Sequence, residues 1–385
     1  MQMQQCARYP GSFGWCPPVD VLRTTAWCTD REFGEAVKTE LSRIVSPAPR
    51  SVWHSLVERD PASTLCSSPL WIDALTRSAR WSDASRYYET ADGRAFVLPL
   101  VRRGPRAAAG LYASLPSGWG MGGFASSDVI RSSDVTAVLA DVRVLNPLGV
   151  RILPNPLRGE AWTRSNFGHS IALDRYAHVL PLERDFDAIW TRSFHRSARQ
   201  NVRKAMRSDL KIERDTTGRF IPVYRELFRQ SIQRWADHSG EPQWLARARG
   251  FREDLPGKLE FLAETLGENM VTWVAWHRSE PAASLITLRG TSVLAWRSAM
   301  SEELGRTTCA GHLLHHHAIE EACADGAANY HFGESGNSCG LSAFKERFGA
   351  IGMPYQEVRC ENVPYTRTNL LARSAVKRLV RYHPG

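Results

Sequence analysis

Hydrophobic positions after residue 50 recur at two spacings, and together they predict an alternation of helices and strands. Apolar residues at three- and four-residue steps predict helices over 133–145, 186–207, 220–235 and the segment that ends before Gly326. Short apolar runs predict strands over 95–101, 172–182, 270–276, 282–288, 293–299 and 327–332. Because helices and strands alternate, the pattern predicts an α/β chain.

The beginning of the chain is patterned more weakly. Residues 31–45 form a candidate helix, but residues 1–50 as a whole carry no readable function and are interpreted as an N-terminal extension. Residues 51–80 predict two short helices, the second opening at Pro69, a residue suited to a first helical turn. Asp92–Gly93 predicts a hairpin turn between two strands.

A length of 385 residues suggests two domains or one double domain. The predicted strand over 172–182 is the natural connection, so we place one lobe at 51–180 and a second at 181–365. Residues 366–385 predict a basic amphipathic helix that suits an RNA backbone and equally a docked C-terminus.

The stretch from Gly311 to Gly349 is the most informative part of the sequence. A helix ends before Gly326, a buried strand follows, and then comes a loop rich in glycine. Ser342 is a candidate cap for a short helix that displays Phe344 and Lys345. A lysine that lies beside aromatic residues and follows a glycine-rich loop indicates a functional site, in addition to a packed hydrophobic core.

The predicted helix over 186–207 carries a stripe of arginines on one face, opposite an apolar face. The stripe consists of Arg192, Arg196, Arg199, Arg203 and Arg207. Like charges at this spacing repel by roughly a few tenths of a kcal/mol per pair, and a phosphate-bearing partner would offset that cost. The alternative is a solvated face, or pairing with acidic residues elsewhere in the fold.

Composition agrees with an anionic partner. The net charge is +9 with a pI of about 9.3, which favours nucleic acid, nucleotides or an acidic surface. The alternative is codon bias, because arginine greatly outnumbers lysine. The eight cysteines form no CxxC pair, no signal peptide is evident, and no apolar run reaches the ~18 residues of a membrane helix. We therefore predict reduced cysteines, no membrane span and a cytoplasmic location.

Histidines cluster on the helix before Gly326. His312, His316 and Glu320 share one face at four-residue spacing and are candidate zinc ligands. Nothing else in the sequence marks a metal site, so we predict none and interpret these histidines as satisfied or solvated.

Two segments resemble a known family. Phe332–Gly333, Phe344–Lys345 and Phe348–Gly349, together with the basic run at 190–207, resemble the Fem-type aminoacyltransferases and their acyltransferase relatives in the GNAT superfamily. The resemblance implies two GNAT-like lobes that share a cleft, each a mixed sheet flanked by helices. It places the functional lysine at Lys345, with Phe344 shaping the pocket, and implies that residues 115–123 line an acceptor cleft. A plain surface loop is the other interpretation of 115–123.

The resemblance also bears on the acyl donor. CoA-dependent GNAT enzymes carry a glycine-rich pyrophosphate loop, and the corresponding residues here are 306–311, with Cys309 where the first glycine should be. Fem-type enzymes lack this loop and use aminoacyl-tRNA. We therefore expect aminoacyl-tRNA as co-substrate and no further cofactor, with acyl-CoA as the alternative donor.

These observations predict an acyltransferase that moves an aminoacyl group from aminoacyl-tRNA to an amine of a peptide-like metabolite or cell-wall precursor. The alternatives are an acyl-CoA-dependent N-acyltransferase acting on a sugar, polyamine or other small amine, and a non-enzymatic RNA-binding protein. Lys345 is the expected cation at the tetrahedral oxyanion. Glu334 and His331 lie beside the loop and are the candidate general bases.

Overall fold

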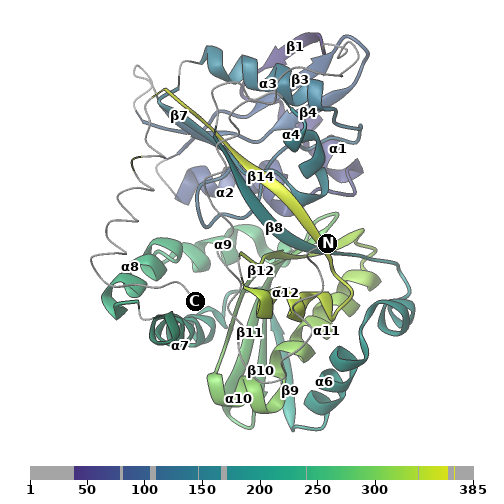
Figure 1. The fold of residues 1–385 in the computed structure, drawn as a ribbon, viewed down its shortest axis with the longest axis vertical. Coiled ribbons are helices and arrows are strands. Elements are labelled where there is room, and N and C mark those ends of the chain that lie inside the picture. Colours follow the sequence, from purple (N-terminus) through teal and green to yellow (C-terminus); the bar gives the residue numbers. More distant parts are fainter. Residues whose placement is uncertain are drawn as a thin grey trace, which may run out of the picture.

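The chain folds into two lobes that share one large sheet, as the computed structural model shows (Figure 1). The structure describes residues 39–78, 81–104, 110–145, 147–165, 171–239, 241–336 and 338–362, together with Thr368. The predictions for residues 1–38 and, apart from Thr368, for the basic helix at 366–385 lie outside the described residues. The predicted mixed α/β fold, with a mixed sheet flanked by helices, is confirmed.

The first lobe opens with a small antiparallel sheet of three strands. The order is β1 (Leu41–Val45), β3 (Arg86–Thr90) and β4 (Ala95–Leu98), and the predicted turn at Gly93 joins the last two with φ 83°. The helix predicted over 31–45 is therefore wrong at 41–45, where backbone groups pair with β3 instead of with the next helical turn. The predicted strand over 95–101 is divided at Pro99, which cannot donate a ladder hydrogen bond.

Helices and short strands complete this lobe. The helices are α1 (Arg50–Arg59), α2 (Pro69–Ser78), α3 (Ser132–Val144) and α4 (Gly159–Thr163). The strands are β2 (Ser82–Asp83), β5 (Val101–Arg103), β6 (Leu111–Ala113) and β7 (Gly149–Ile152). The helix start at Pro69 is confirmed.

Two long strands carry the large sheet from one lobe into the other. They are β8 (Ile171–Pro181), which confirms the predicted crossing strand, and β14 (Ile351–Glu361) (Figure 1). The eleven strands follow the order β2-β5-β6-β7-β14-β8-β13-β12-β11-β10-β9. Although β14 comes late in the sequence, it pairs with β7 of the first lobe and with nine consecutive positions of β8.

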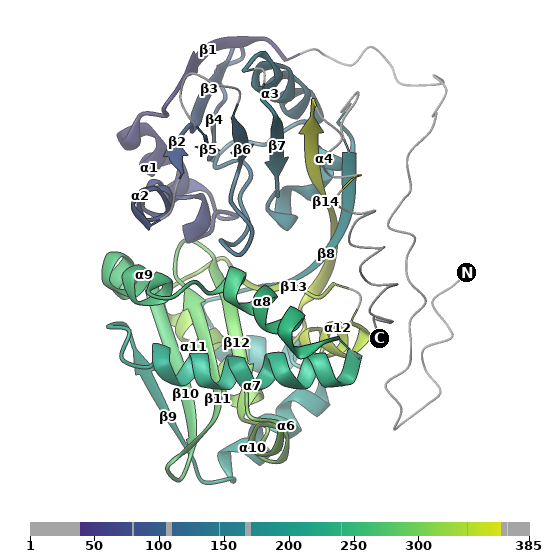
Figure 2. The ribbon, with the colours of Figure 1, turned by 90° about the vertical axis from the view of Figure 1, so that its left-hand side faces the viewer.

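The second lobe places helices on both faces of the sheet. Its further strands are β9 (Leu210–Asp215), β10 (Met270–His277), β11 (Glu280–Leu288), β12 (Val293–Met300) and β13 (Asn329–Glu334). The last four confirm the predicted strands, whereas β9 was not predicted. Its longer helices are α6 (Arg196–Met206), α7 (Ile221–Ser239), α8 (Gln243–Glu253), α9 (Lys258–Leu266), α10 (Glu302–Thr308), α11 (Ala310–Ala324) and α12 (Cys339–Glu346). Figure 2 shows α7 and α11 on opposite faces of the sheet.

The segment at 115–123 lies between the lobes. The carbonyl of Gly118 accepts hydrogen bonds from Lys258 Nζ at 3.0 Å and from Arg297 at 3.3 Å, and the Lys258 ammonium lies 4.3 Å from the ring centre of Trp119. Trp71 donates its indole N–H to the carbonyl of Trp119 at 3.1 Å. These contacts exclude the plain surface loop; whether the segment lines an acceptor cleft stays a prediction.

The single helix predicted over 186–207 is wrong in its middle. The structure has α5 (Phe186–Ala188), a π-helical turn (Ile189–Ser193), an extended residue at Phe194 and then α6. The Phe194 ring packs 5.0 Å from the ring of Phe348, and the side chain of His195 caps α6 by accepting from Ser197 N. Arg192 therefore precedes the helix that carries the other four arginines.

Gly349 is required where β14 approaches this break. Its φ is 83°, and a Cβ atom there would lie 2.5 Å from the carbonyl oxygen of Ser193. We expect Gly349→Ala to lower the free energy of unfolding by at least about 2 kcal/mol, because it combines left-handed strain with a backbone collision. Gly311→Ala is the matched control: an added Cβ meets nothing within 4 Å on α11, so stability should stay equal or rise by up to about 1 kcal/mol. Equal stability of the two variants in urea unfolding would refute this account.

Candidate active site

The candidate site lies where β13 ends and the chain turns into α12. Gly333 and Gly336 have positive φ values of 73° and 52°, so the backbone bends sharply on both sides of Glu334. Ser338 caps α12 by accepting a hydrogen bond from Leu341 N at 3.3 Å. The predicted cap at Ser342 is therefore wrong, because that residue lies within the helix.

Lys345 connects α12 to this bend. Its Nζ donates to the carbonyl oxygens of Gly333 and Glu334, each at 2.8 Å, and the residue is only 4% exposed. Burial lowers the pKa of Lys345 to about 8, against the opposing effect of the Glu334 carboxylate. The ammonium group holds the backbone of the bend, and its third N–H has no partner among the residues that the structure describes.

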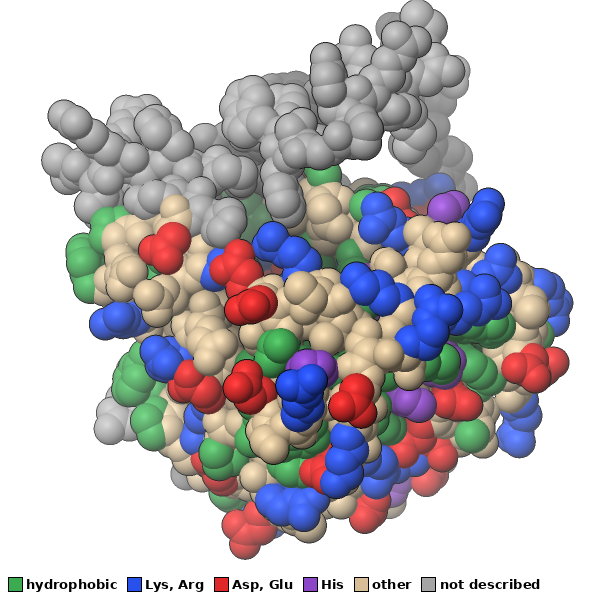
Figure 3. Space-filling model, turned by 90° about the horizontal axis from the view of Figure 1, so that it is seen from below, with side chains coloured by type: hydrophobic (Ala, Val, Ile, Leu, Met, Phe, Trp, Pro, Cys, Tyr) green, Lys and Arg blue, Asp and Glu red, His purple; other side chains and the backbone are tan. Residues whose placement is uncertain are grey.

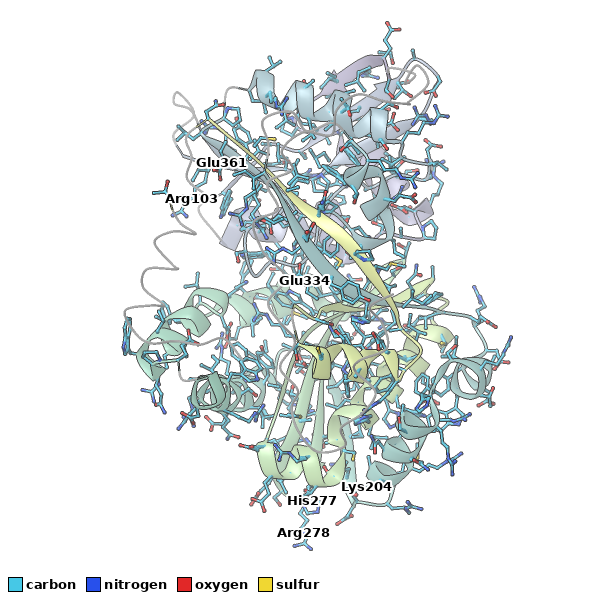
Figure 4. All side chains as sticks on the ribbon, in the orientation of Figure 1. Arg103, Lys204, His277, Arg278, Glu334 and Glu361 are labelled. Atoms are coloured by element: carbon cyan, nitrogen blue, oxygen red, sulfur yellow. The ribbon has the colours of Figure 1, made fainter. Side chains whose placement is uncertain are left out.

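Glu334 lies at the junction of the lobes, beneath the crossing strands (Figure 4). Its carboxylate accepts a hydrogen bond from the Tyr355 hydroxyl at 2.5 Å and lies 3.5 Å from Arg175. Burial, followed by the Glu334 carboxylate, raises the pKa of Tyr355, so this hydroxyl remains a donor. Because the Glu334 side chain is exposed, it presents a carboxylate to solvent beside the bend.

Phe344 lies on the same helix but packs inward. Its ring lies 4.9 Å from His312 and 5.3 Å from Phe348. His315, also in this cluster, hydrogen-bonds through Nδ1 to the Tyr330 hydroxyl at 2.8 Å. Phe344 thus supports α12 from the core side, and a role in shaping the pocket stays a prediction.

His331 is placed differently from Glu334. It is fully buried on β13, opposite Val179 and Leu294 in the neighbouring strands. Neither ring nitrogen has a hydrogen-bond partner among the described residues, and burial lowers its pKa to about 4. Its predicted role as general base has no proton path in the described part of the chain.

A buried charge network supports the site from β14. Glu357 is fully buried, and its carboxylate binds Arg151 at 2.8 Å, Arg359 at 2.7 Å, and Arg175, which also approaches Glu334. Burial raises the pKa of Glu357, but the arginines outweigh burial and lower it to about 2. The network therefore joins β7, β8 and β14 directly behind the site.

Glu357→Gln should destabilise the protein by about 1–3 kcal/mol at pH 7, because it removes the charge of a buried carboxylate that three half-buried arginines bind. The folded pKa is depressed from 4.5 to about 2, so this stability is present above pH 4.5 and is lost as pH falls toward 2. Urea unfolding of wild type should show that loss, and the variant should show less of it. Glu264→Gln, at an exposed position of α9, is the control and should change little. Parallel pH profiles for wild type and Glu357→Gln would contradict the assignment.

A second set of polar residues was missed by sequence reasoning. Ser335 Oγ lies 2.9 Å from His178 Nδ1, and His178 Nε2 lies 3.4 Å from Glu346 Oε1. Both are buried: His178 lies on β8, and Ser335 lies just after β13. No local signal marks His178, since 157 residues separate it from Ser335.

The arginine stripe is exposed and has few acidic partners. Arg196, Arg203 and Arg207 are exposed and form no ion pair with any carboxylate that the structure describes. Arg199 donates to the carbonyl of Thr191 at 3.0 Å, and Arg192 pairs with Glu183 at 3.2 Å. Figure 3 shows Lys and Arg side chains gathered on the side of the molecule where α6 lies. The face is thus an uncompensated positive surface.

The predicted zinc ligands separate into two environments. His312 contacts Asn201 of α6 at 3.1 Å, whereas His316 lies near His317 and Glu320, with ligand atoms within 4.8 Å of one another. Burial lowers the pKa of His316 to about 4, so this imidazole is neutral at pH 7. The absence of a metal stays a prediction. Among the helices that the structure describes, none is long and apolar enough to cross a membrane.

The residues that correspond to a pyrophosphate loop form almost continuous helix. α10 ends at Thr308 and α11 begins at Ala310, with Cys309 between them at φ 56°. Cys309 adopts the left-handed conformation that glycine favours. One residue therefore separates the two helices, in place of a glycine-rich loop.

Comparison with known families identifies one domain. Residues 174–346 match the family described as the acetyltransferase (GNAT) domain, which confirms the predicted GNAT type for this part of the chain. No curated protein matches the chain.

Several solved structures are similar in architecture at low identity. FemX is 15% identical with a TM-score of 0.49, over 82% of this chain and 96% of FemX. The C-terminal DUF2156 domain of a putative lysylphosphatidylglycerol synthetase from Agrobacterium fabrum is 12% identical, with a TM-score of 0.48, over 85% of this chain and 95% of that one. A tandem GNAT protein from the clavulanic acid biosynthesis pathway is 11% identical, with a TM-score of 0.44, over 84% and 99%. Similarity at this level identifies no substrate.

Proposed function

We propose that the chain, which has a GNAT domain at residues 174–346, is an acyltransferase that forms an amide bond, with aminoacyl-tRNA as donor and an amine of a peptide-like metabolite or cell-wall precursor as acceptor. The observation that carries the proposal is the uncompensated arginine surface of α6. Phosphate groups of a nucleic acid are suited to such a surface, since each makes charge-assisted hydrogen bonds with guanidinium groups.

The arginine surface is connected to the candidate site. The backbone N–H of His195, which caps α6, donates to the carbonyl of Arg347 at the end of α12 at 2.8 Å. α6 also contacts α11 through Asn201 and His312. An RNA bound along α6 would therefore bring its acylated end toward the helix that carries Lys345.

The helices α10 and α11 also support aminoacyl-tRNA as the donor, because they leave no open glycine-rich loop between residues 302 and 324. A CoA pyrophosphate is bound by backbone N–H groups that an open glycine loop exposes. In α10 and α11 most such groups are already used within the helices. Aminoacyl-tRNA requires no such loop.

Lys345 is suited to stabilise the tetrahedral oxyanion. The acceptor amine attacks the ester carbonyl, and negative charge develops on the carbonyl oxygen. Two N–H groups of Lys345 hold the bend, and we assign the third to this oxygen. Glu334, held by Tyr355, is assigned to bind the acceptor amine as its carboxylate partner.

The second candidate is an acyl-CoA-dependent N-acyltransferase that acts on a sugar, polyamine or other small amine. The matched family description, an acetyltransferase domain, favours it. In that case Lys345 keeps its role, and the α6 surface has no part in donor binding.

A binding comparison on the purified protein separates the two donors. Bulk aminoacyl-tRNA and acetyl-CoA are titrated separately at two salt concentrations, with anisotropy and melting temperature as readouts. We expect tight, strongly salt-dependent tRNA binding and no stabilisation by acetyl-CoA. Stabilisation by acetyl-CoA without tRNA binding would overturn the proposed donor and favour the second candidate.

A further inference from the structure

A chain of three polar side chains begins at Ser335, the residue after Glu334, and ends at solvent. Ser335 Oγ lies 2.9 Å from His178 Nδ1, and His178 Nε2 lies 3.4 Å from Glu346 Oε1. Ser335 is 4% exposed and His178 is fully buried, whereas the Glu346 side chain is 53% exposed. The chain therefore begins inside the protein and ends at its surface.

This chain is built on the same backbone as the site. Ser335 directly follows Glu334, and its N–H donates to the carbonyl of Tyr176 at 3.1 Å. Glu346 directly follows Lys345, which binds the carbonyl of Glu334. Ser335 therefore directly follows the carboxylate that we assign to the acceptor amine, and Glu346 directly follows the ammonium that we assign to the oxyanion.

The surroundings of His178 determine its protonation. Glu346 and Lys345 face it from α12, Ser335 faces it from the end of β13, and the Tyr176 ring on its own strand lies 5.1 Å away. Burial lowers the pKa of His178, Glu346 opposes that effect, and Lys345 adds to it, so the imidazole is neutral at pH 7.

The two neighbours also select the tautomer of His178. A carboxylate only accepts hydrogen bonds, so the Nε2 that faces Glu346 carries the proton. Nδ1 is then the acceptor and receives the hydroxyl proton of Ser335. In this state the imidazole is ready to take a proton from the serine.

We propose that Ser335, His178 and Glu346 form a proton relay that removes the proton of the acceptor amine. This inference rests on the proposed acyl transfer. When the C–N bond forms, the amine nitrogen carries an extra proton; that proton passes to Ser335 Oγ while the hydroxyl proton passes to His178 Nδ1. The C–O or C–S bond of the donor then breaks, and the leaving group departs with the electron pair.

The relay resets when the imidazolium returns its Nδ1 proton. The carboxylate beside Nε2 stabilises the imidazolium, and the Nδ1 proton passes back through Ser335 Oγ to the oxygen or sulfur of the leaving group, so that Nε2 keeps its own proton. Ser335 touches the amine and is the catalytic residue of the three. His178 and Glu346 act through it and are positioning residues.

The test compares steady-state transfer and its pH dependence for wild type, His178→Gln and Ser335→Ala. Glutamine retains hydrogen bonds but does not titrate. We expect kcat of each variant to fall about 10²-fold or more, with KM changed by less than threefold. Wild type should lose activity as pH falls through the pKa of His178, which lies below 6.5, because a protonated imidazole cannot accept; His178→Gln should lack this limb.

Two further variants separate the relay from structural support. Ser335→Thr keeps the hydroxyl and should recover most of the activity lost in Ser335→Ala. His277→Gln, at the far tip of the second lobe, is the matched control and should behave as wild type (Figure 4).

The outcomes distinguish this inference from the proposed function. If wild type transfers an acyl group and His178→Gln keeps its rate and pH profile, the relay is overturned and the function stands. If wild type transfers from neither donor, the proposed function fails, and the relay fails with it. Nitrogen-15 NMR of His178 tests the assigned tautomer without any substrate; a proton on Nδ1 at pH 7 would also overturn the relay.

Discussion

Lys345→Met should lower kcat for acyl transfer by about 10² to 10³, the usual effect of losing one oxyanion donor. Methionine is similar in length and apolar, so it fills the same buried space. It cannot hold the carbonyls of Gly333 and Glu334, and we expect a loss of stability of about 1–3 kcal/mol as well. Steady-state rates measured well below the variant's melting temperature separate the two effects.

The ionisation of Lys345 gives this prediction a second readout. Its pKa of about 8 means that the ammonium loses its proton as pH rises through 8, so wild-type activity should decline there. Lys211→Met, at an exposed position of β9, is the control and should retain the wild-type rate and profile. A Lys345→Met enzyme within threefold of the wild-type rate would show that the lysine only supports the fold.

Replacing Arg196, Arg203 and Arg207 together by glutamine should weaken binding of aminoacyl-tRNA about 10–100-fold at physiological salt. Each contact with a phosphate contributes roughly 0.7–0.9 to the slope of log affinity against log salt, so the slope should fall by about 2 to 3. Melting temperature should hardly change, since these side chains are exposed and pair with no described carboxylate. Anisotropy titrations at several salt concentrations provide the measurement.

The control removes the same net charge elsewhere. The exposed arginines chosen are Arg59 on α1, Arg164 directly after α4 and Arg229 on α7. Their triple glutamine variant should keep most of the affinity. If both triple variants lose the same affinity for aminoacyl-tRNA, the loss reflects the lower net charge of the protein, and α6 is then not a specific binding surface.

Several strands and helices of the second lobe were predictable, because the local spacing of apolar and polar residues determines them. Apolar runs separated by turn residues determined β10, β11 and β12, and the step of the arginines determined the exposed face of α6. Pattern failed where one residue interrupts a continuous periodicity. Phe194 fits the helical spacing, but its ring packs beside Phe348, and the helix begins again at Arg196, after the cap at His195.

The candidate site was only partly predictable. Lys345 was found through its place in a sequence motif, but its burial and its bonds to two carbonyls depend on how α12 returns to β13. The contact of Ser335 with His178 joins residues 157 positions apart, and that of Arg151 with Glu357 spans 206. The first contact depends on the pairing of β8 with β13, and the second on the pairing of β7 with β14. A single sequence does not indicate which distant strands pair, so neither contact could be predicted.

The late position of β14 in the sequence constrains how the protein is made. The edges of β7 and β8 that face each other across β14 are joined only when residues 351–361 are present. During synthesis from the N-terminus, the first lobe therefore emerges with one edge of β7 and one edge of β8 unpaired. Both edges stay unpaired until almost the whole chain has been made. A nascent chain stopped before residue 351 should recruit holdase chaperones, and release of β14 from the ribosome should be the step that frees them.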